Sequence, residues 1–127
     1  MSRVLAFDFG ASTGRAILGE YENGRLSYRE IHRFDNELVT ENGKLCWNFP
    51  YLLSEVKKAI EMVNDVDSLA FDTWGVDYGI IGADGELKGL PVCYRDTRTK
   101  NVPEKIFEKI SLRVSPFARF LSLVYER

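Results

Sequence analysis

The pair Asn23-Gly24 limits the possible folds of this chain more than any other local feature. It separates two strand-like runs, residues 15–21 and 26–34, and both of its residues tolerate the positive φ angles of a tight hairpin turn. A second such pair, Asn42-Gly43, comes just before the short apolar run 45–47. The sequence therefore predicts antiparallel strands joined by short turns through its first third.

Other apolar runs predict a sheet that is not purely antiparallel. A buried strand is predicted over residues 4–9 and a further core strand over 68–71. Between them we expect a helix from Asn48 to about residue 64, with its apolar residues on one face. The further predicted elements are a hairpin with arms 79–81 and 87–94 around Asp84-Gly85, and a helix from Asn101 to Ile110. This order predicts an α/β fold, a ribonuclease-H-like mixed β-sheet flanked by helices.

Composition narrows the classes of function. The 127 residues suit one domain, and 17 Lys and Arg against 19 Asp and Glu give a net charge of −2, which argues against a dedicated nucleic-acid binder. The apolar runs are too short for a signal peptide or a membrane span, so we expect a cytoplasmic protein. We expect Cys46 and Cys93 to be reduced core thiols, and His32 to be a satisfied strand residue rather than a catalytic base. No metal-ligand spacing suggests a zinc site.

A glycine-bounded turn follows the first predicted strand. Its sequence is Asp8-Phe9-Gly10-Ala11-Ser12-Thr13-Gly14-Arg15. Such a turn can direct successive backbone N–H groups at phosphate oxygens, the hydroxyls of Ser12 and Thr13 add donors, and Asp8 could hold a hydrated Mg²⁺. The alternative is a plain hairpin turn that Asp8 caps, since the two commonest nucleotide-binding fingerprints are absent.

Two further polar and aromatic groups follow later in the chain. The segment DTWGVDYG, residues 72–79, resembles a carbohydrate site, where carboxylates accept from hydroxyls and an aromatic face covers the sugar. Ligands of α/β sheets tend to bind at the carboxyl ends of strands, where this segment and the first turn are both predicted. The alternative is a turn with Trp74 in the core. Within residues 94–98, Arg95 could orient a polyol or a phosphate, or could belong to a surface ion-pair cluster.

Taken in order, these blocks resemble the rhamnulokinases, a family of FGGY carbohydrate kinases in the actin-like ATPase superfamily. The blocks are DFGASTGR, EIHRF, a WN before a helix, DTWGVDYG and LPVCYRDTR, between about Val4 and Ile110. The resemblance implies ATP- and Mg²⁺-dependent transfer of the γ-phosphate to the 1-hydroxyl of L-rhamnulose. It also implies a small-molecule sugar as partner, with no nucleic acid and no membrane.

The resemblance also implies roles for individual residues. By position, it assigns residues 11–15 to the ATP phosphates, and it assigns Gly75, with Val76 and Asp77 beside it, to the sugar. With the residues singled out above, the predicted ATP site consists of Asp8, Gly10, Ala11, Ser12, Thr13, Gly14 and Arg15, and Asp8 holds the metal through water. The predicted substrate site consists of Thr73, Trp74, Gly75, Val76, Asp77 and Arg95.

The resemblance covers only part of such a kinase. The general-base aspartate and the second domain of the family lie beyond the matched region, 1–110, so we expect the isolated chain to be inactive. Residues 111–127 do not resemble the family, and a frameshift, a premature stop or a foreign end would explain them. We expect the edge left by the missing domain to favour self-association. The alternatives from other classes are a two-metal ribonuclease-H-like nuclease using Asp8 and Asp72, and a non-catalytic binding domain.

Overall fold

The structure, a computed structural model, describes residues 1–109 and divides the chain into two compact units, Met1–Arg95 and Asp96–Arg127. The first unit contains all the predicted site residues. In the second, the described part consists of a turn of 3₁₀ helix, η1 (Thr97–Thr99), and helix α2 (Val102–Lys109), near where the sequence predicted a helix. The predicted tail, residues 111–127, lies outside the described residues.

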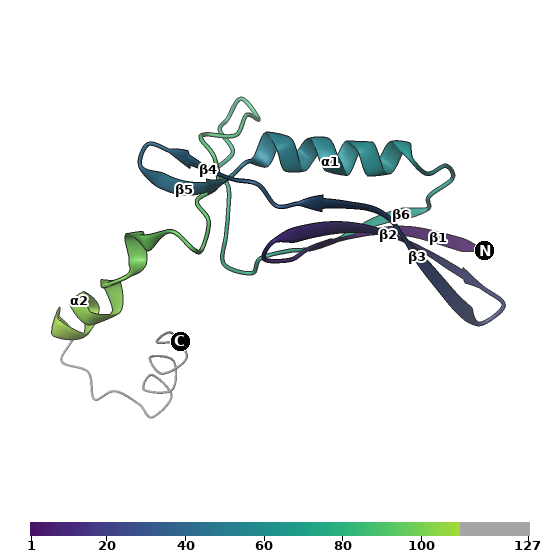
Figure 1. The fold of residues 1–127 in the computed structure, drawn as a ribbon, viewed down its shortest axis with the longest axis horizontal. Helices are drawn as coiled ribbons and strands as arrows, with labels where there is room; N and C mark the ends of the chain where they lie inside the picture. The colour runs from purple at the N-terminus through teal and green to yellow at the C-terminus, as the bar shows by residue number, and fades with distance from the viewer. Residues whose placement is uncertain (110–127) are drawn as a thin grey trace. The chain divides into compact units, whose positions relative to one another are not determined.

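The first unit is built on a four-stranded sheet with the strand order β3-β2-β1-β6 (Figure 1). Its antiparallel strands are β1 (Ser2–Phe9), β2 (Thr13–Glu22) and β3 (Arg25–Asp35). The fourth strand, β6 (Ser68–Asp72), pairs with β1 in parallel. A separate antiparallel pair consists of β4 (Leu38–Glu41) and β5 (Lys44–Trp47). The main sheet is mixed, and the predicted α/β fold class is confirmed.

Both Asn-Gly pairs form the predicted turns. Asn23 and Gly24 have φ angles of 50° and 76°, and Asn42 and Gly43 have φ angles of 50° and 73°. Positive φ at both central residues matches the twist of the flanking antiparallel strands. The two pairs therefore connect β2 to β3 and β4 to β5 as expected.

The third predicted hairpin is only partly present. Gly85 has a φ of 80° in its turn, but a single bridge, Ile81 to Leu87, joins the two arms. The later arm pairs elsewhere, because Val92 forms a bridge with Cys46 of β5 and the Pro91 carbonyl accepts from Trp47 N at 2.9 Å. The predicted hairpin therefore forms near its turn, whereas the end of its later arm pairs with β5 instead.

Helix α1 (Phe49–Glu61) connects β5 to β6 and runs along one face of the main sheet (Figure 1). The side chain of Asn48 caps its start by accepting from Tyr51 N at 3.3 Å. The helix ends three residues before the predicted position, because the chain leaves helical geometry and reaches a φ of 55° at Asp65. None of the described helices has the length and hydrophobicity needed to cross a membrane.

The core lies between α1 and the sheet. One buried cluster joins Leu5, Phe7 and Ala16 of the sheet to Val56 and Ala59 of the helix. A second cluster consists of Phe34, Trp47, Leu52 and Cys93. Both cysteines of the chain are buried and are not joined in a disulfide, as predicted.

Strand β6 differs from its prediction. The sequence predicted a core strand, but all five of its residues are exposed. The cause is its place at the end of the sheet, where no described strand pairs with its outer edge.

Glu55 is buried in α1, with 4% of its surface exposed, and joins the helix to β3. Its carboxylate accepts from Lys58 Nζ at 2.5 Å and from His32 Nε2 at 2.7 Å. The hydrogen bond from Lys58 lowers the pKa of Glu55, burial opposes this change, and the bond to His32 lowers the pKa further. His32 is thus a satisfied strand histidine, as predicted.

Replacing Glu55 should make the protein less stable at neutral pH but not in acid. The lowered pKa of Glu55 means that its stabilising effect is present above its usual value of 4.5 and is lost as pH falls through the folded-state pKa. Glu55→Gln is therefore expected to lower the free energy of unfolding by about 1–3 kcal/mol at pH 7. The exposed Glu61→Gln in the same helix is the matched control. Urea unfolding at pH 7 and pH 3 measures the free energy of unfolding of both variants. Equal stability of the two variants at pH 7 would contradict the role of Glu55.

Candidate functional site

The parallel pairing of β1 with β6 brings two carboxylates side by side. Asp8 and Asp72 are partners in the register, at the last position that the two strands share. Side chains alternate along a strand and Phe7 packs toward α1, so both carboxylates lie on the opposite face of the sheet. Arg15 Nη2 lies 2.9 Å from Asp8 Oδ2. Arg15 Nε has no hydrogen-bond partner among the described residues, so the guanidinium has an unsatisfied donor.

The turn between β1 and β2 is held by its carbonyl groups. Gly10 O accepts from Asn36 Nδ2 at 2.6 Å, and Ser12 O accepts from Asn36 N at 2.8 Å. Ala11 and Ser12 are exposed, and their backbone N–H groups form no hydrogen bond with the described residues. The turn therefore leaves N–H groups, rather than carbonyl oxygens, available to a ligand.

Trp74 ties this turn to the loop that follows β6. Its Nε1–H donates to Gly10 O at 3.0 Å. Its ring stacks on Trp47, with centroids 3.6 Å apart and ring planes 6° apart, and Phe9 meets it edge-on at 5.9 Å. Trp74 is half-buried, so it packs against the core, as one interpretation of the sequence expected, and also reaches the turn.

Asp77 is fixed through one of its two oxygens. Oδ2 accepts from Trp47 Nε1 at 2.6 Å and from Tyr94 N at 3.2 Å. Oδ1 takes part in neither bond. The carboxylate is therefore positioned by one oxygen, while the other can accept from a ligand hydroxyl.

Arg95 connects the third predicted group to the first. Its Nη2 donates to Ala11 O at 2.8 Å, and its Nε donates to Tyr94 Oη at 3.2 Å. Its guanidinium carbon lies 5.6 Å from the centroid of the Tyr94 ring. The structure thus brings residues from all three predicted groups to the turn between β1 and β2.

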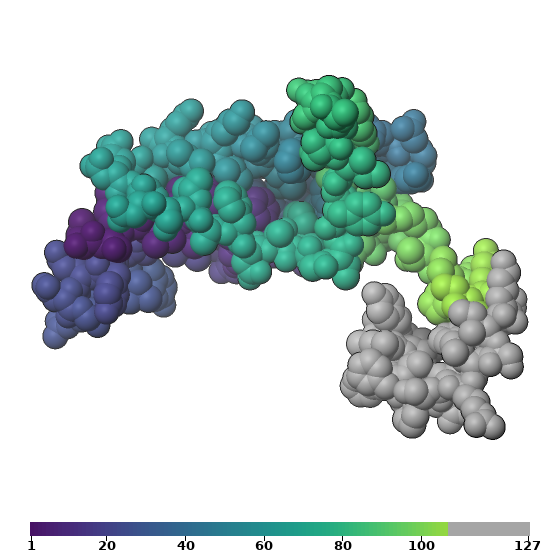
Figure 2. Space-filling model, turned by 180° about the vertical axis from the view of Figure 1, so that it is seen from behind, coloured from purple at the N-terminus to yellow at the C-terminus, as the bar shows by residue number. Residues whose placement is uncertain are grey.

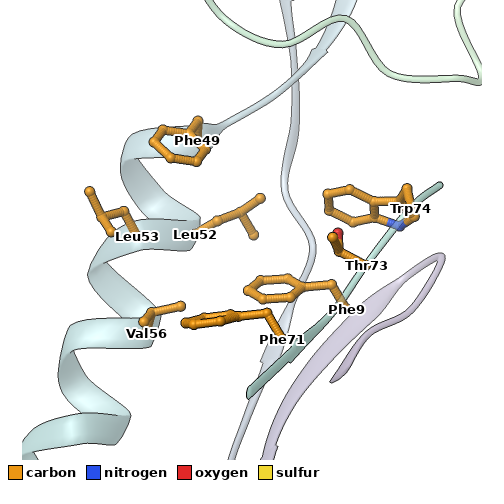
Figure 3. A pocket seen from close by; sticks show the side chains of 8 residues that line it. All are labelled: Phe9, Phe49, Leu52, Leu53, Val56, Phe71, Thr73 and Trp74. Carbon is orange, nitrogen blue, oxygen red and sulfur yellow. The ribbon is translucent and has the colours of Figure 1, made fainter. Parts of the chain in front are cut away.

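The rest of the loop after β6 is open. Val76 is 68% exposed, and a Cβ on Gly75 would meet no atom within 4 Å. Thr73 and Trp74 line a hollow of about 320 Å³ beside α1 (Figure 3) and another of about 150 Å³ that Asp77 also lines. The loop has room for a ligand to approach its backbone closely.

The carboxylates at this edge suit a hydrated Mg²⁺. Mg²⁺ prefers oxygen ligands and keeps several of its waters, which two neighbouring carboxylates at a strand end can hydrogen-bond. Within residues 1–109, no three His, Cys, Asp or Glu side chains gather closely enough to form a metal cage. An ion held here by Asp8 and Asp72 would complete its coordination shell with water and ligand oxygens.

Sequence reasoning missed two residues that hold the site together. Asn36 fixes the turn from a position 26 residues away from Gly10, and no local pattern indicates such a contact. Trp47, which is 1% exposed, was expected in a short strand and in the WN block of the resemblance, but its support of both Trp74 and Asp77 was not predicted. Its position beside the helix cap Asn48 does not predict this stacking, because its partner Trp74 lies on a loop that is distant in the sequence.

Gly14 is required by close packing, whereas Gly75 is not. A Cβ at Gly14 would lie 2.3 Å from the Phe34 ring, so Gly14→Ala is expected to lower the free energy of unfolding by about 1–3 kcal/mol. Gly75→Ala, the matched control, meets open space and should change it by less than about 0.5 kcal/mol. Urea unfolding of the two variants compares them directly. Equal losses would contradict the packing described for the turn.

Comparison with known proteins identifies relatives of this chain. It is 38% identical over 117 residues to a rhamnulokinase of Mannheimia succiniciproducens, covering 87% of this chain and 24% of the relative. It is 42% identical over 104 residues to a rhamnulokinase of Klebsiella pneumoniae, covering 77% of this chain and 21% of the relative. It is 35% identical over 140 residues to a rhamnulokinase of Lactiplantibacillus plantarum, covering 99% of this chain and 28% of the relative. The chain thus spans about a quarter of the length of these curated relatives. No protein-family model matches it.

Solved structures agree on the fold. A ligand-bound xylulose kinase from Lactobacillus acidophilus superposes with a TM-score of 0.67 at 14% identity, covering 86% of this chain and 23% of that structure. A gluconate kinase from the same organism gives the same TM-score and identity, covering 85% of this chain and 23% of that structure. Over the part that it spans, the chain is therefore similar in sequence to these rhamnulokinases and shares the α/β fold of these two sugar kinases.

Proposed function

We propose that this chain forms one wall of the active site of a kinase that transfers the γ-phosphate of ATP to the 1-hydroxyl of L-rhamnulose. The observation that carries this proposal is the bond from Trp74 Nε1 to Gly10 O, which joins the predicted phosphate turn to the predicted sugar loop. Phosphoryl transfer requires donor and acceptor to be held in line, so two adjoining binding loops suit this reaction. The resemblance assigns the general base to a region outside the match, so we expect ligand binding without turnover.

The turn between β1 and β2 suits the phosphate groups of ATP. The exposed N–H groups of Ala11 and Ser12 can donate to phosphate oxygens, because other groups already occupy the neighbouring carbonyl oxygens. The hydroxyl of Thr13 adds a donor at the start of β2. Arg15 and Arg95 supply positive charge at either side, which favours the charged phosphates over a neutral ligand.

The loop after β6 suits a polyol. Asp77 Oδ1 can accept from a hydroxyl, and Trp74 offers an aromatic surface that Trp47 stiffens from one side. The open space at Gly75 allows a ligand to approach the backbone. These features suit the binding of a sugar but do not distinguish one sugar from another. We choose L-rhamnulose because the relatives are rhamnulokinases.

Asp8 and Asp72 would hold Mg²⁺ through water in this scheme. Bound there, Mg²⁺ would neutralise charge on the phosphate groups. Arg15 holds the Asp8 carboxylate in place by the contact of its Nη2 with Oδ2, and its Nε has no partner among the described residues. Binding and positioning are therefore the contributions of this chain to the reaction.

A nuclease is the second candidate, because Asp8 and Asp72 are neighbours in the register as metal-binding carboxylates would be. Two observations weigh against it. Arg15 already pairs with one oxygen of Asp8, and a net charge of −2 provides little attraction for a nucleic-acid backbone. The relatives favour the kinase. Cleavage of an RNA–DNA hybrid that requires Mg²⁺ would support the nuclease instead.

A negative charge placed in the phosphate turn should weaken nucleotide binding. Ser12→Asp adds a carboxylate to an exposed turn, where it repels phosphate, and we expect at least tenfold weaker binding of MgATP. Ser27→Asp, at an exposed position of β3, adds the same charge elsewhere and should bind like the unmodified chain. NMR titration of backbone amides measures both affinities and locates the site. Equal weakening in both variants, or no shifts at residues 10–15, would favour a non-catalytic domain instead.

A further inference from the structure

Trp47, the last residue of β5, contacts two residues of the loop after β6 through its indole. It is 1% exposed, and its backbone N–H donates to Pro91 O at 2.9 Å. The blue segment that includes β5 lies beside the green segment around residues 81–92 in Figure 1 and, seen from behind, in Figure 2. A buried indole carries one donor, Nε1–H, and leaving it unpaired would cost free energy. The fold of this region therefore requires an acceptor beside Trp47.

The indole N–H of Trp47 sets the orientation of Asp77. It donates to Asp77 Oδ2 at 2.6 Å, and hydrogen bonds to a carboxylate are stronger than those between neutral groups. The same oxygen accepts from Tyr94 N at 3.2 Å, but this second bond is longer and exposed, so water can replace it. Water cannot replace the donor of a residue that is 1% exposed in the same way. Trp47 therefore fixes Oδ2 and leaves Oδ1 as the oxygen for a ligand hydroxyl.

The ring face of Trp47 sets the orientation of Trp74. The two rings lie 6° from parallel with centroids 3.6 Å apart, and Phe9 meets the Trp74 ring edge-on at 5.9 Å. A rotation of Trp74 about its side-chain bonds would break this stack. Held in this orientation, Trp74 directs its own Nε1–H at Gly10 O, 3.0 Å away. The ring of Trp47 thereby acts on the turn between β1 and β2 through Trp74.

We propose that Trp47 is a positioning residue with two separable roles, one for each binding loop. Its N–H group lies in the plane of the ring, whereas its stacking surface is the face of the ring, so one can be removed without the other. The N–H group serves the sugar through Asp77, and the ring serves ATP through Trp74 and Gly10. For the identity of these ligands the inference rests on the proposed function, but both contacts can be tested without a ligand.

Trp47→Phe should separate the two roles, because a phenylalanine ring keeps an aromatic face but has no donor. We expect about tenfold weaker binding of L-rhamnulose, since Asp77 loses a hydrogen bond to its carboxylate, and unchanged binding of MgATP. Trp47→Leu removes the ring as well and should weaken both ligands. Leu5→Val, which shrinks a buried residue of the other core cluster, is the matched control and should weaken neither. NMR titration measures the affinities, and equal weakening of both ligands by Trp47→Phe would contradict the separation.

Hydrogen exchange tests the positioning role without a ligand. In Trp47→Phe, Asp77 is no longer held by the indole, so the Tyr94 amide hydrogen should exchange faster, whereas the indole hydrogen of Trp74 should not. The amides of β1 serve as the reference, because a general loss of stability would speed their exchange too. Asp77→Ala tests the same bond from its other end and should speed exchange of the Trp47 indole hydrogen. Exchange that changes in neither variant would overturn the inference.

The unmodified chain supplies a test that does not depend on the folding of any variant. The Trp47 indole proton donates to the carboxylate that the sugar would use, so its NMR resonance should shift when L-rhamnulose is added. MgATP alone should shift the Trp74 indole proton instead. A Trp47 proton that does not respond while the Gly75 amide shifts with the sugar would refute the N–H role. If the sugar shifts no resonance, the proposed sugar site fails, and hydrogen exchange still decides the positioning role.

Discussion

The parallel pairing of β1 with β6 is the constraint on which the rest of the first unit depends. It aligns Val4 to Asp8 with Ser68 to Asp72, so both strands end at the same edge and deliver their following loops to one place. Parallel neighbours need a crossover connection, which α1 provides while it covers the core. The same pairing places β6 at the end of the sheet that the described strands form.

Residues of the candidate site also hold the fold together. Trp74 packs on Trp47 and donates to Gly10, and Asp77 accepts from Trp47 with one oxygen. Such dual use fixes the geometry of the loops before any ligand arrives, which lowers the ordering cost of binding. It also means that substitutions at these positions change stability and ligand affinity together. Positions where an added side chain meets open space, such as Gly75, are better probes of binding alone.

Local signals in the sequence predicted most of the first unit. The Asn-Gly turns and the Asn48 cap depend on residues a few positions apart, so their geometry follows from local chemistry. The prediction that Asp8 and Asp72 end neighbouring strands is confirmed, because β1 and β6 pair in parallel with these two residues in register. The sequence did not predict the hydrogen bonds from Asn36 to the turn. It also did not predict that residues 91–93 pair with β5. The exposure of β6 was not predicted either, because it depends on which strands pair with its outer edge, and none of the described strands does.

The central claim is that the turn after β1 and the loop after β6 act as one binding site. The indole N–H of Trp74 reports on it directly, because this group belongs to the loop and donates to the turn at Gly10 O. Its proton resonance should shift when MgATP is added and shift again when L-rhamnulose follows. An indole resonance that responds to neither ligand, while the chain remains folded, would contradict the account.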